Sequence, residues 1–271
     1  MSISPDRPRA VPRPPAAVPG DPPPWAALDG SRRGAVTVER VTGALAGAGR
    51  GGDVPPGLGP PPSELRRHAG SLPVPPAPAA VLIALFDEAG EARVLLTRRS
   101  TSLRLHRGEV SFPGGRLDPG EDVRSGALRE AEEEIGLAPS LVHPVGWLDP
   151  VLTLGSNSVL TPVVARLRER PVLRPNPAEV DRVFDVELAH LMADGVCHQE
   201  LWAPPGVAEP FPVSFFEADG EVVWGATARV LMNLLGLVIG GGNGGGNGGT
   251  PAPAAPLLRT AGGRGRPAPR R

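Results

Sequence analysis

Between Val81 and Ile239 the chain alternates apolar runs with segments of helical periodicity. This alternation limits the possible folds more than any other feature of the sequence. Residues 81–86 form a continuous apolar run, which is typical of a buried strand. A turn over residues 87–91 and a second strand over 93–97 predict a hairpin. Further strands are predicted near residues 142–148, 159–167, 181–187, 211–217 and 221–224, with a closing helix over 224–239. The order of elements indicates one α/β domain.

Glycine and proline, 36 residues of each, are concentrated outside this region. Residues 1–24 are proline-rich, residues 51–62 read as a linker, and the sequence GGGNGGGNGGT begins at residue 240. Residues 25–50 are compatible with one or two weak helices, and residues 63–70 with a short one. We therefore expect a mostly disordered N-terminal extension over 1–64, a folded domain over 65–239, and a disordered tail over 240–271.

Charge and cysteine content exclude several classes of protein. The formal net charge is −1, so no broad basic surface for nucleic acid is expected. Cys197 is the single cysteine, which rules out a disulfide framework within the chain. The N-terminus has no apolar core of a secretory signal, and the longest apolar run near the C-terminus is too short to span a bilayer. We expect a cytoplasmic protein that binds neither nucleic acid nor membrane.

The segment from Pro113 to Leu137 carries the strongest chemical signal. A helix is predicted over 121–134, ended by a left-handed cap at Gly136. Three carboxylates, at Glu130, Glu133 and Glu134, then share one helix face, because residues three and four apart are neighbours on a helix. The opposite face, which would dock on a sheet, carries Leu128, Ala131 and Ile135. Like charges at this spacing repel, and a hard divalent cation with oxygen ligands would offset that repulsion.

Glutamate-rich helices are often only solvated faces, so the flanking residues decide between the two interpretations. Gly114 and Gly115 precede the helix, and glycine lets a backbone approach a phosphate or metal closely. Arg129 is placed to pair with one of the carboxylates. Glu121 is favourably placed at the positive end of the helix. These flanks favour a functional site over a merely solvated face.

The spacing of these residues resembles the Nudix box. Five residues separate Gly115 from Glu121, seven more lead to Arg129, and Glu130, Glu133, Glu134, Gly136 and Leu137 complete the pattern. Ala131 departs from the usual larger aliphatic residue, but it is predicted to face the core. The resemblance implies a Nudix α/β/α sandwich, with a mixed sheet between helices. It also implies Mg²⁺ or Mn²⁺ as cofactor, held by Glu130, Glu133, Glu134 and the carbonyl of Gly115, with Arg129 orienting the carboxylates.

The stretch before the box resembles the coenzyme A diphosphatase branch of this family. The matching residues are Leu95, Leu96, Thr97, Arg99, Ser100, Arg104, Gly108, Phe112, Pro113, Gly114 and Gly115, and the segments 176–180 and 224–229 also match. Glu109 departs from the glutamine that many relatives carry. The resemblance implies that Arg99, Arg104, Gly114 and Gly115 bind substrate. Arg107 and His106 stay open between a substrate contact and a structural role.

The implied reaction is hydrolysis of coenzyme A, or a derivative, to 4′-phosphopantetheine and adenosine 3′,5′-bisphosphate. Either Glu134 or Glu179, which lies outside the box, would act as the general base. One alternative is another substrate, namely ADP-ribose, a dinucleoside polyphosphate or a nucleoside triphosphate. A second is a nucleotide-binding module without turnover, although such modules usually lose box carboxylates. The oligomeric state stays open, with a homodimer as one alternative.

Overall fold

The computed structural model describes residues 11–54, 75–103, 105–153, 156–203 and 210–240. Its helices are α1 (Gly30–Arg33), α2 (Val38–Gly47), α4 (Val123–Ile135), the 3-10 turn η1 (Pro139–Leu141), α5 (Leu188–Leu191) and α6 (Gly225–Gly240). No helix in the described ranges is both long and apolar enough to cross a membrane.

The described strands form two sheets. The larger sheet has eight, namely β2 (Ala77–Glu88), β3 (Glu91–Arg99), β4 (Val110–Ser111), β5 (Gly114–Arg116), β6 (His143–Trp147), β7 (Val151–Thr153), β8 (Ser158–Arg166) and β9 (Val180–Glu187). It is mixed, because β2 and β8 run parallel whereas the other pairs are antiparallel. The smaller sheet is antiparallel, in the order β1 (Val18–Pro19), β10 (Cys197–Trp202), β11 (Phe211–Ala218) and β12 (Glu221–Trp224).

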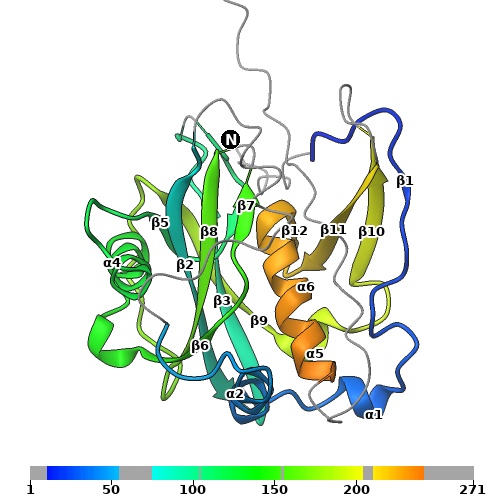
Figure 1. Cartoon of the computed structure of the whole chain (residues 1–271), viewed down its shortest axis with the longest axis horizontal. Coiled ribbons are helices and arrows are strands. Elements are labelled where there is room, and N and C mark those ends of the chain that lie inside the picture. The colour runs from blue at the N-terminus through cyan, green and yellow to red at the C-terminus, as the bar shows by residue number, and fades with distance from the viewer. Residues whose placement is uncertain (1–10, 55–74, 104, 154–155, 204–209, 241–271) are drawn as a thin grey trace, which may run out of the picture.

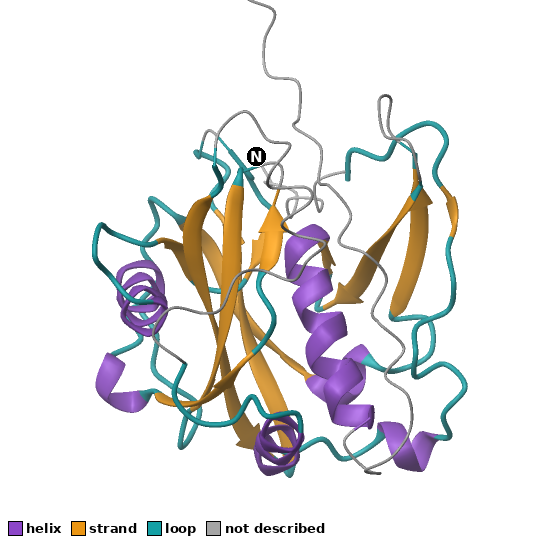
Figure 2. Cartoon of the chain, viewed as in Figure 1, coloured by secondary structure: helices purple, strands orange, loops and turns teal. Residues whose placement is uncertain are grey.

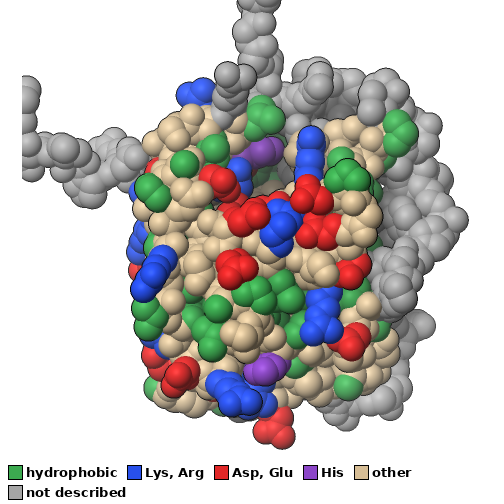
Figure 3. Space-filling view, turned by 90° about the vertical axis from the view of Figure 1, so that its left-hand side faces the viewer, with side chains coloured by type: hydrophobic (Ala, Val, Ile, Leu, Met, Phe, Trp, Pro, Cys, Tyr) green, Lys and Arg blue, Asp and Glu red, His purple; other side chains and the backbone are tan. Residues whose placement is uncertain are grey.

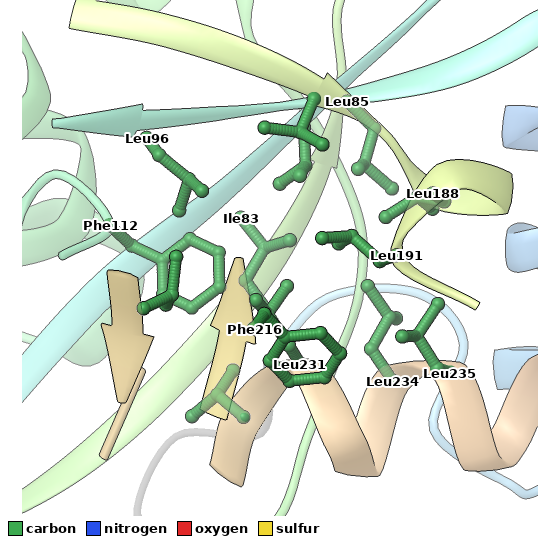
Figure 4. Packing of buried hydrophobic residues seen from close by; sticks show 14 of the residues in the cluster. Ile83, Leu85, Leu96, Phe112, Leu188, Leu191, Phe216, Leu231, Leu234 and Leu235 are labelled. Carbon is green, nitrogen blue, oxygen red and sulfur yellow. The ribbon is translucent and has the colours of Figure 1, made fainter. Parts of the chain in front are cut away.

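The layers are α4, the large sheet, α6 and the small sheet (Figures 1 and 2). Helix α4 covers one face of the large sheet through an apolar cluster that includes Leu82, Leu95, Ala131 and Ile135. A larger cluster joins the opposite face to α6 and the small sheet, and Figure 4 shows Ile83, Leu96, Phe216 and Leu231 meeting there. Alternate side chains of β2 and β3 belong to one cluster or the other, because successive residues of a strand point to opposite faces. Both faces of these two strands are therefore buried.

This architecture confirms the predicted α/β/α sandwich with a mixed sheet. The hairpin of β2 and β3, the strands β6, β8, β9, β11 and β12, and the helices α4 and α6 all lie where the sequence predicts them. The structure adds that β11 and β12 belong to a separate small sheet. It also adds short strands that carry no clear periodicity of their own, such as β4, β5 and β7.

The N-terminal region differs from the prediction. Residues 1–64 are expected to be a mostly disordered extension, yet much of the described part, 11–54, packs against the domain. Trp25 is 1% exposed and stacks on Phe216. The backbone amide of Val38 donates to Asp87 on the β2–β3 hairpin (2.9 Å). These contacts bury apolar side chains that a disordered segment would leave in water. The predicted short helix over 63–70 and the tail beyond residue 240 lie outside the described residues.

Helix α2 gives a direct test of this packing. Leu45 is fully buried in the larger cluster, so Leu45→Ala is expected to lower the free energy of unfolding by about 2–4 kcal/mol. Glu39→Ala, on the exposed face of the same helix, is expected to change it by less than about 0.5 kcal/mol. Urea denaturation of the full chain measures both. Equal, small effects would show that α2 does not contribute to the core.

Candidate active site

Helix α4 begins and ends where its capping residues dictate. The side chain of Asp122 accepts a hydrogen bond from the Ser125 amide (2.8 Å), and Gly136 closes the helix at φ 67°. Ala131 and Ile135 are fully buried against the sheet, as the sequence predicts. The helix begins at Val123, so Glu121, predicted as its first residue, lies just before the N-cap Asp122.

The three box carboxylates are exposed to different degrees. Glu134 is 2% exposed, the Glu130 side chain 16% and the Glu133 side chain 55%. On the face of the molecule that carries α4, acidic side chains gather around basic ones (Figure 3). The predicted carboxylate face thus exists, and it runs from the solvent at Glu133 into the protein at Glu134.

Arg129 is the centre of this charged group. Its guanidinium donates to Glu121 (2.9 and 3.0 Å), Glu130 (3.1 Å) and Glu133 (3.0 Å), and to the backbone carbonyl of Arg116 (3.1 Å). The hydrogen bond from Arg129 lowers the pKa of Glu121, and the hydrogen bond to Glu121 in turn raises the pKa of Arg129. One guanidinium therefore fixes two box carboxylates, where the sequence predicts a pair with one.

Glu134 joins the helix to two other parts of the site. It accepts hydrogen bonds from the backbone amide of Gly114 (3.1 Å) and from the guanidinium of Arg99 (3.3 Å). Burial raises its pKa to about 7, and the nearby carboxylates of Glu130 and Glu179 act in the same direction. Burial also raises the pKa of Glu130. The inner end of the carboxylate face is therefore a place where negative charge is poorly compensated.

Glu179 lies near the carboxylates because the loop before β9 packs against the C-terminal end of α4. The amide of Asn176 donates to the carbonyl of Glu134 (2.8 Å), and the amide of Arg174 donates to the carbonyl of Ile135 (2.8 Å). These bonds satisfy carbonyls at the end of the helix, which have no partner within it. The carbonyl of Glu179 then accepts from the Ser100 amide (2.7 Å) at the start of the loop after β3. Residues 176–180 thus connect α4 to that loop.

Gly114 and Gly115 lie on β5, between β2 and α4. Gly114 has φ 151°, and a Cβ atom there would lie 2.6 Å from the Cα of Val81. A Cβ atom on Gly115 would lie 2.5 Å from the Cδ of Glu130. At Gly114 only glycine allows the backbone to approach the neighbouring strand so closely, and at Gly115 the absence of a side chain leaves room for a box carboxylate.

Some residues of the upstream motif hold the strands together, and others point toward the box helix. Thr97 is fully buried and its hydroxyl donates to the carbonyl of Ser111 (3.1 Å), so it holds the β3–β4 pair together. Arg99 points to Glu134, as described above. His106 contacts Glu109 (2.8 Å) within the same loop. Arg104, which the resemblance implies as a substrate contact, lies outside the described residues.

The acidic side chains around α4 are the candidate donors for a divalent cation. Within the described part of the chain, no three His, Cys, Asp or Glu side chains converge closely enough to hold a metal ion in this conformation. The groups nearest to doing so are all oxygen donors, namely Glu130, Glu134, Glu179 and the exposed Glu133. Mutual repulsion between buried carboxylates is what a hard cation relieves, so the chemistry of the donors fits Mg²⁺ or Mn²⁺.

Comparison with known proteins places this geometry in a family. Residues 76–201 match the model of the NUDIX domain. Nudix hydrolase 22, chloroplastic, of Arabidopsis thaliana is 44% identical over 165 residues, which are 58% of this chain and 54% of that protein. Nudix hydrolase 15, mitochondrial, of the same plant is 41% identical over 167 residues, 58% of this chain and 57% of that protein. The chain spans little more than half the length of these two relatives.

A bacterial relative is covered more completely. The Nudix hydrolase NudL of Photorhabdus laumondii is 36% identical over 181 residues, which are 65% of this chain and 89% of that protein. The residues that match the NUDIX domain, 76–201, include α4 with its three carboxylates, the glycines of β5 and the loop after β3. The chain therefore belongs to the Nudix hydrolase family.

Proposed function

We propose that the protein hydrolyses the diphosphate bond of coenzyme A, or of a derivative, with the help of divalent metal ions. The observation that carries this proposal is the position of Glu134. Its carboxylate accepts from Arg99 of the upstream motif and from Gly114 of β5, while it belongs to the box helix itself. The motif that resembles coenzyme A diphosphatases and the box that resembles a metal site thus share one buried carboxylate.

The metal would be held by Glu130, Glu133 and Glu134, with the carbonyl of Gly115. When bound, a divalent cation supplies charge neutralisation for the diphosphate and lowers the pKa of a coordinated water. Arg129 keeps the carboxylates of Glu130 and Glu133 in place through hydrogen bonds of 3.1 and 3.0 Å. Each of these bonds uses one oxygen of a carboxylate, so Arg129 can orient Glu130 and Glu133 while their second oxygens bind the metal.

Proton transfer needs a carboxylate close to the proposed metal ligands. Glu179 raises the pKa of both Glu130 and Glu134, so its side chain lies within electrostatic reach of the site. We assign Glu179 as the group that takes the proton of the attacking water, with Glu134 as the alternative. The carbonyl of Glu179 accepts from the Ser100 amide (2.7 Å) at the start of the loop after β3, and this proximity supports the assignment.

Coenzyme A suits the arginines of that loop. It carries a 3′-phosphate in addition to its diphosphate, and guanidinium groups bind phosphate with two parallel hydrogen bonds. Arg99 stands at the start of the loop and next to Glu134. We assign Arg99 and Arg104 to the phosphates and the backbone of Gly114 and Gly115 to the diphosphate. A cytoplasmic location and a homodimer remain predictions.

The test is product analysis by mass spectrometry. The purified chain is incubated with coenzyme A, ADP-ribose and dATP in turn, with Mg²⁺ or Mn²⁺. We expect 4′-phosphopantetheine and adenosine 3′,5′-bisphosphate to form fastest. Glu133→Gln is expected to lower that rate at least about tenfold, the smallest loss typical of a damaged metal site. Glu132→Gln, the same change at the exposed neighbouring residue, is expected to leave it unchanged.

Each other outcome removes a defined part of the proposal. Faster hydrolysis of ADP-ribose or dATP would exclude coenzyme A as the preferred substrate. The protein would then be a Nudix hydrolase of another nucleoside diphosphate derivative. Full activity of Glu133→Gln with an intact fold would remove the metal assignment. Absence of turnover with either metal would favour a module that binds nucleotides without cleaving them.

A further inference from the structure

The loop between β3 and β4 starts where the β3–β4 ladder ends. Arg98 and Val110 are the last cross-strand partners of the β3–β4 ladder, after Thr97 and Ser111. Arg99 follows Arg98 directly, and its backbone bonds with Glu109 (2.9 Å) and Gly108 (3.0 Å) continue the same pairing, so its position depends in part on how firmly the Arg98–Val110 pair is held. Both members of the pair are held by parts of the chain that lie beyond the residues matching the NUDIX domain, 76–201.

Arg98 is held by β12. Its guanidinium donates to Glu221 (3.2 Å), and the same carboxylate oxygen accepts from Arg182 on β9 (3.1 Å). Glu221 is only 4% exposed, so its charge depends on these two guanidiniums. Removing one partner of such a buried ion pair is costly, because the remaining charge is left without compensation. Glu221 thus fixes the side chains of two neighbouring strands, since Arg98 and Arg182 are themselves partners in the β3–β9 ladder.

Val110 is held by α6. The hydroxyl of Thr227, in the first turn of the helix, donates to the carbonyl of Val110 (3.0 Å). Thr227 is 8% exposed and Val110 is 4% exposed, so water does not compete for this bond. The segment from Trp224 to Arg229, which resembles the coenzyme A diphosphatase branch, thereby gains a physical role at the base of the loop.

Arg98 and Arg99 point to opposite sides of the sheet because they are consecutive residues of β3, and a β-bulge in the neighbouring strand β9 lies beside them. Arg98 pairs with Arg182, but Arg99 pairs with Val180, so the ladder skips Asp181. The carboxylate of Asp181 accepts from the Thr101 amide (3.1 Å), at the start of the loop. The bulged residue, Asp181, thus connects β9 to the loop after β3, and bulges are common next to functional sites. Here Arg98 reaches Glu221 in the small sheet, whereas Arg99 reaches Glu134 of the box.

We propose that Glu221 and Thr227 are positioning residues, which hold the Arg98–Val110 pair so that Arg99 and its loop meet the substrate phosphates. This inference rests on the proposed function, and it assigns the end of the small sheet and the start of α6 to the substrate site. Neither residue touches the box carboxylates in the contacts described above. Their effect on the reaction therefore passes through Arg98 and Val110 to Arg99.

The test uses Glu221→Gln and Thr227→Val in the full chain, with steady-state kinetics on the best substrate of the wild type. Both variants are expected to raise KM about fivefold, the effect of losing one hydrogen bond, with kcat within about twofold of wild type. The matched control is Asp219→Asn, because Asp219 lies on the same hairpin and binds Arg182 without contacting Arg98. Loss of folded protein would lower the apparent kcat and leave KM unchanged, and thermal unfolding checks each variant.

A double-mutant cycle with Arg99→Ala shows whether the effect passes through Arg99. In the Arg99→Ala background, Glu221→Gln and Thr227→Val are expected to cause no further rise in KM. A rise equal to that in the wild-type background would overturn the proposal, as would a change confined to kcat. If the wild type cleaves no substrate, the proposed function fails, and the same cycle is measured as calorimetric binding of adenosine 3′,5′-bisphosphate. Additive effects on that binding, or no binding by the wild type, would also overturn the inference.

Discussion

Glu134→Gln is expected to lower kcat by at least about 10²-fold, because it removes a charge that the reaction needs at the centre of the site. Glutamine keeps the shape of the side chain and one oxygen that can accept from Gly114 or Arg99, so the fold is expected to persist. It cannot offer two anionic oxygens to a divalent cation. The change therefore removes the charge of Glu134 but keeps its packing. The ratio of kcat between wild type and variant, measured with Mg²⁺ or Mn²⁺, gives the effect of the charge.

The same variant is expected to be more stable than the wild type when metal is removed. Burial raises the pKa of Glu134 from its usual value of 4.5 to about 7. A carboxyl with a raised folded-state pKa favours folding below the unfolded value, and that contribution is lost as the pH rises through the folded value. The wild type should therefore lose about 3 kcal/mol from this group between pH 4 and pH 8. Glutamine does not ionise, so it avoids this loss.

Urea denaturation in the presence of a chelator measures that difference. Glu134→Gln and wild type are expected to have similar stability near pH 4, and the variant should become increasingly more stable toward pH 8. Glu132→Gln, at an exposed position of the same helix, should follow the wild type at every pH. A Glu134→Gln variant that is less stable than wild type at pH 8 would show that the bonds from Arg99 and Gly114 outweigh the cost of burying the charge.

The sequence predicts the parts of this site that depend on local spacing. Glu130, Glu133 and Glu134 share a face because the helix period puts them there, and Ala131 faces the core for the same reason. Gly136 adopts the predicted left-handed cap. Periodicity and capping are properties of a few consecutive residues, so one sequence is enough to predict them.

The features that the sequence does not predict depend on contacts between distant residues. Strand β5 contains two glycines, which have low strand propensity, and it forms because β2 offers it a partner. Trp25 is buried against Phe216, nearly two hundred positions later, in a region whose proline content suggests disorder. Glu221 and Thr227 reach the loop base from the end of the domain. None of these contacts leaves a periodic pattern near the residues that make it.

The adjacent glycines of β5 are expected to respond to alanine in opposite ways. At Gly114 the new Cβ atom would lie 2.6 Å from the Cα of Val81 and would also strike the carbonyl oxygen of Ala80. Both neighbours are backbone atoms of the central strand β2, and φ is 151°, so neither the strand nor the glycine can adjust cheaply. Gly114→Ala is therefore expected to lower the free energy of unfolding by about 3 kcal/mol or more, or to prevent folding.

At Gly115 the new Cβ atom would meet only the carboxylate end of Glu130, with 2.5 Å to its Cδ. A carboxylate on a flexible side chain can move, so Gly115→Ala should change the free energy of unfolding by less than about 1 kcal/mol. The movement would take Glu130 away from Arg129 and from the place where a metal is proposed. We expect hydrolysis to fall by about 10- to 100-fold while thermal unfolding stays close to wild type. A Gly115→Ala variant with full activity would show that Glu130 is not needed at its observed position, and would remove it from the metal site.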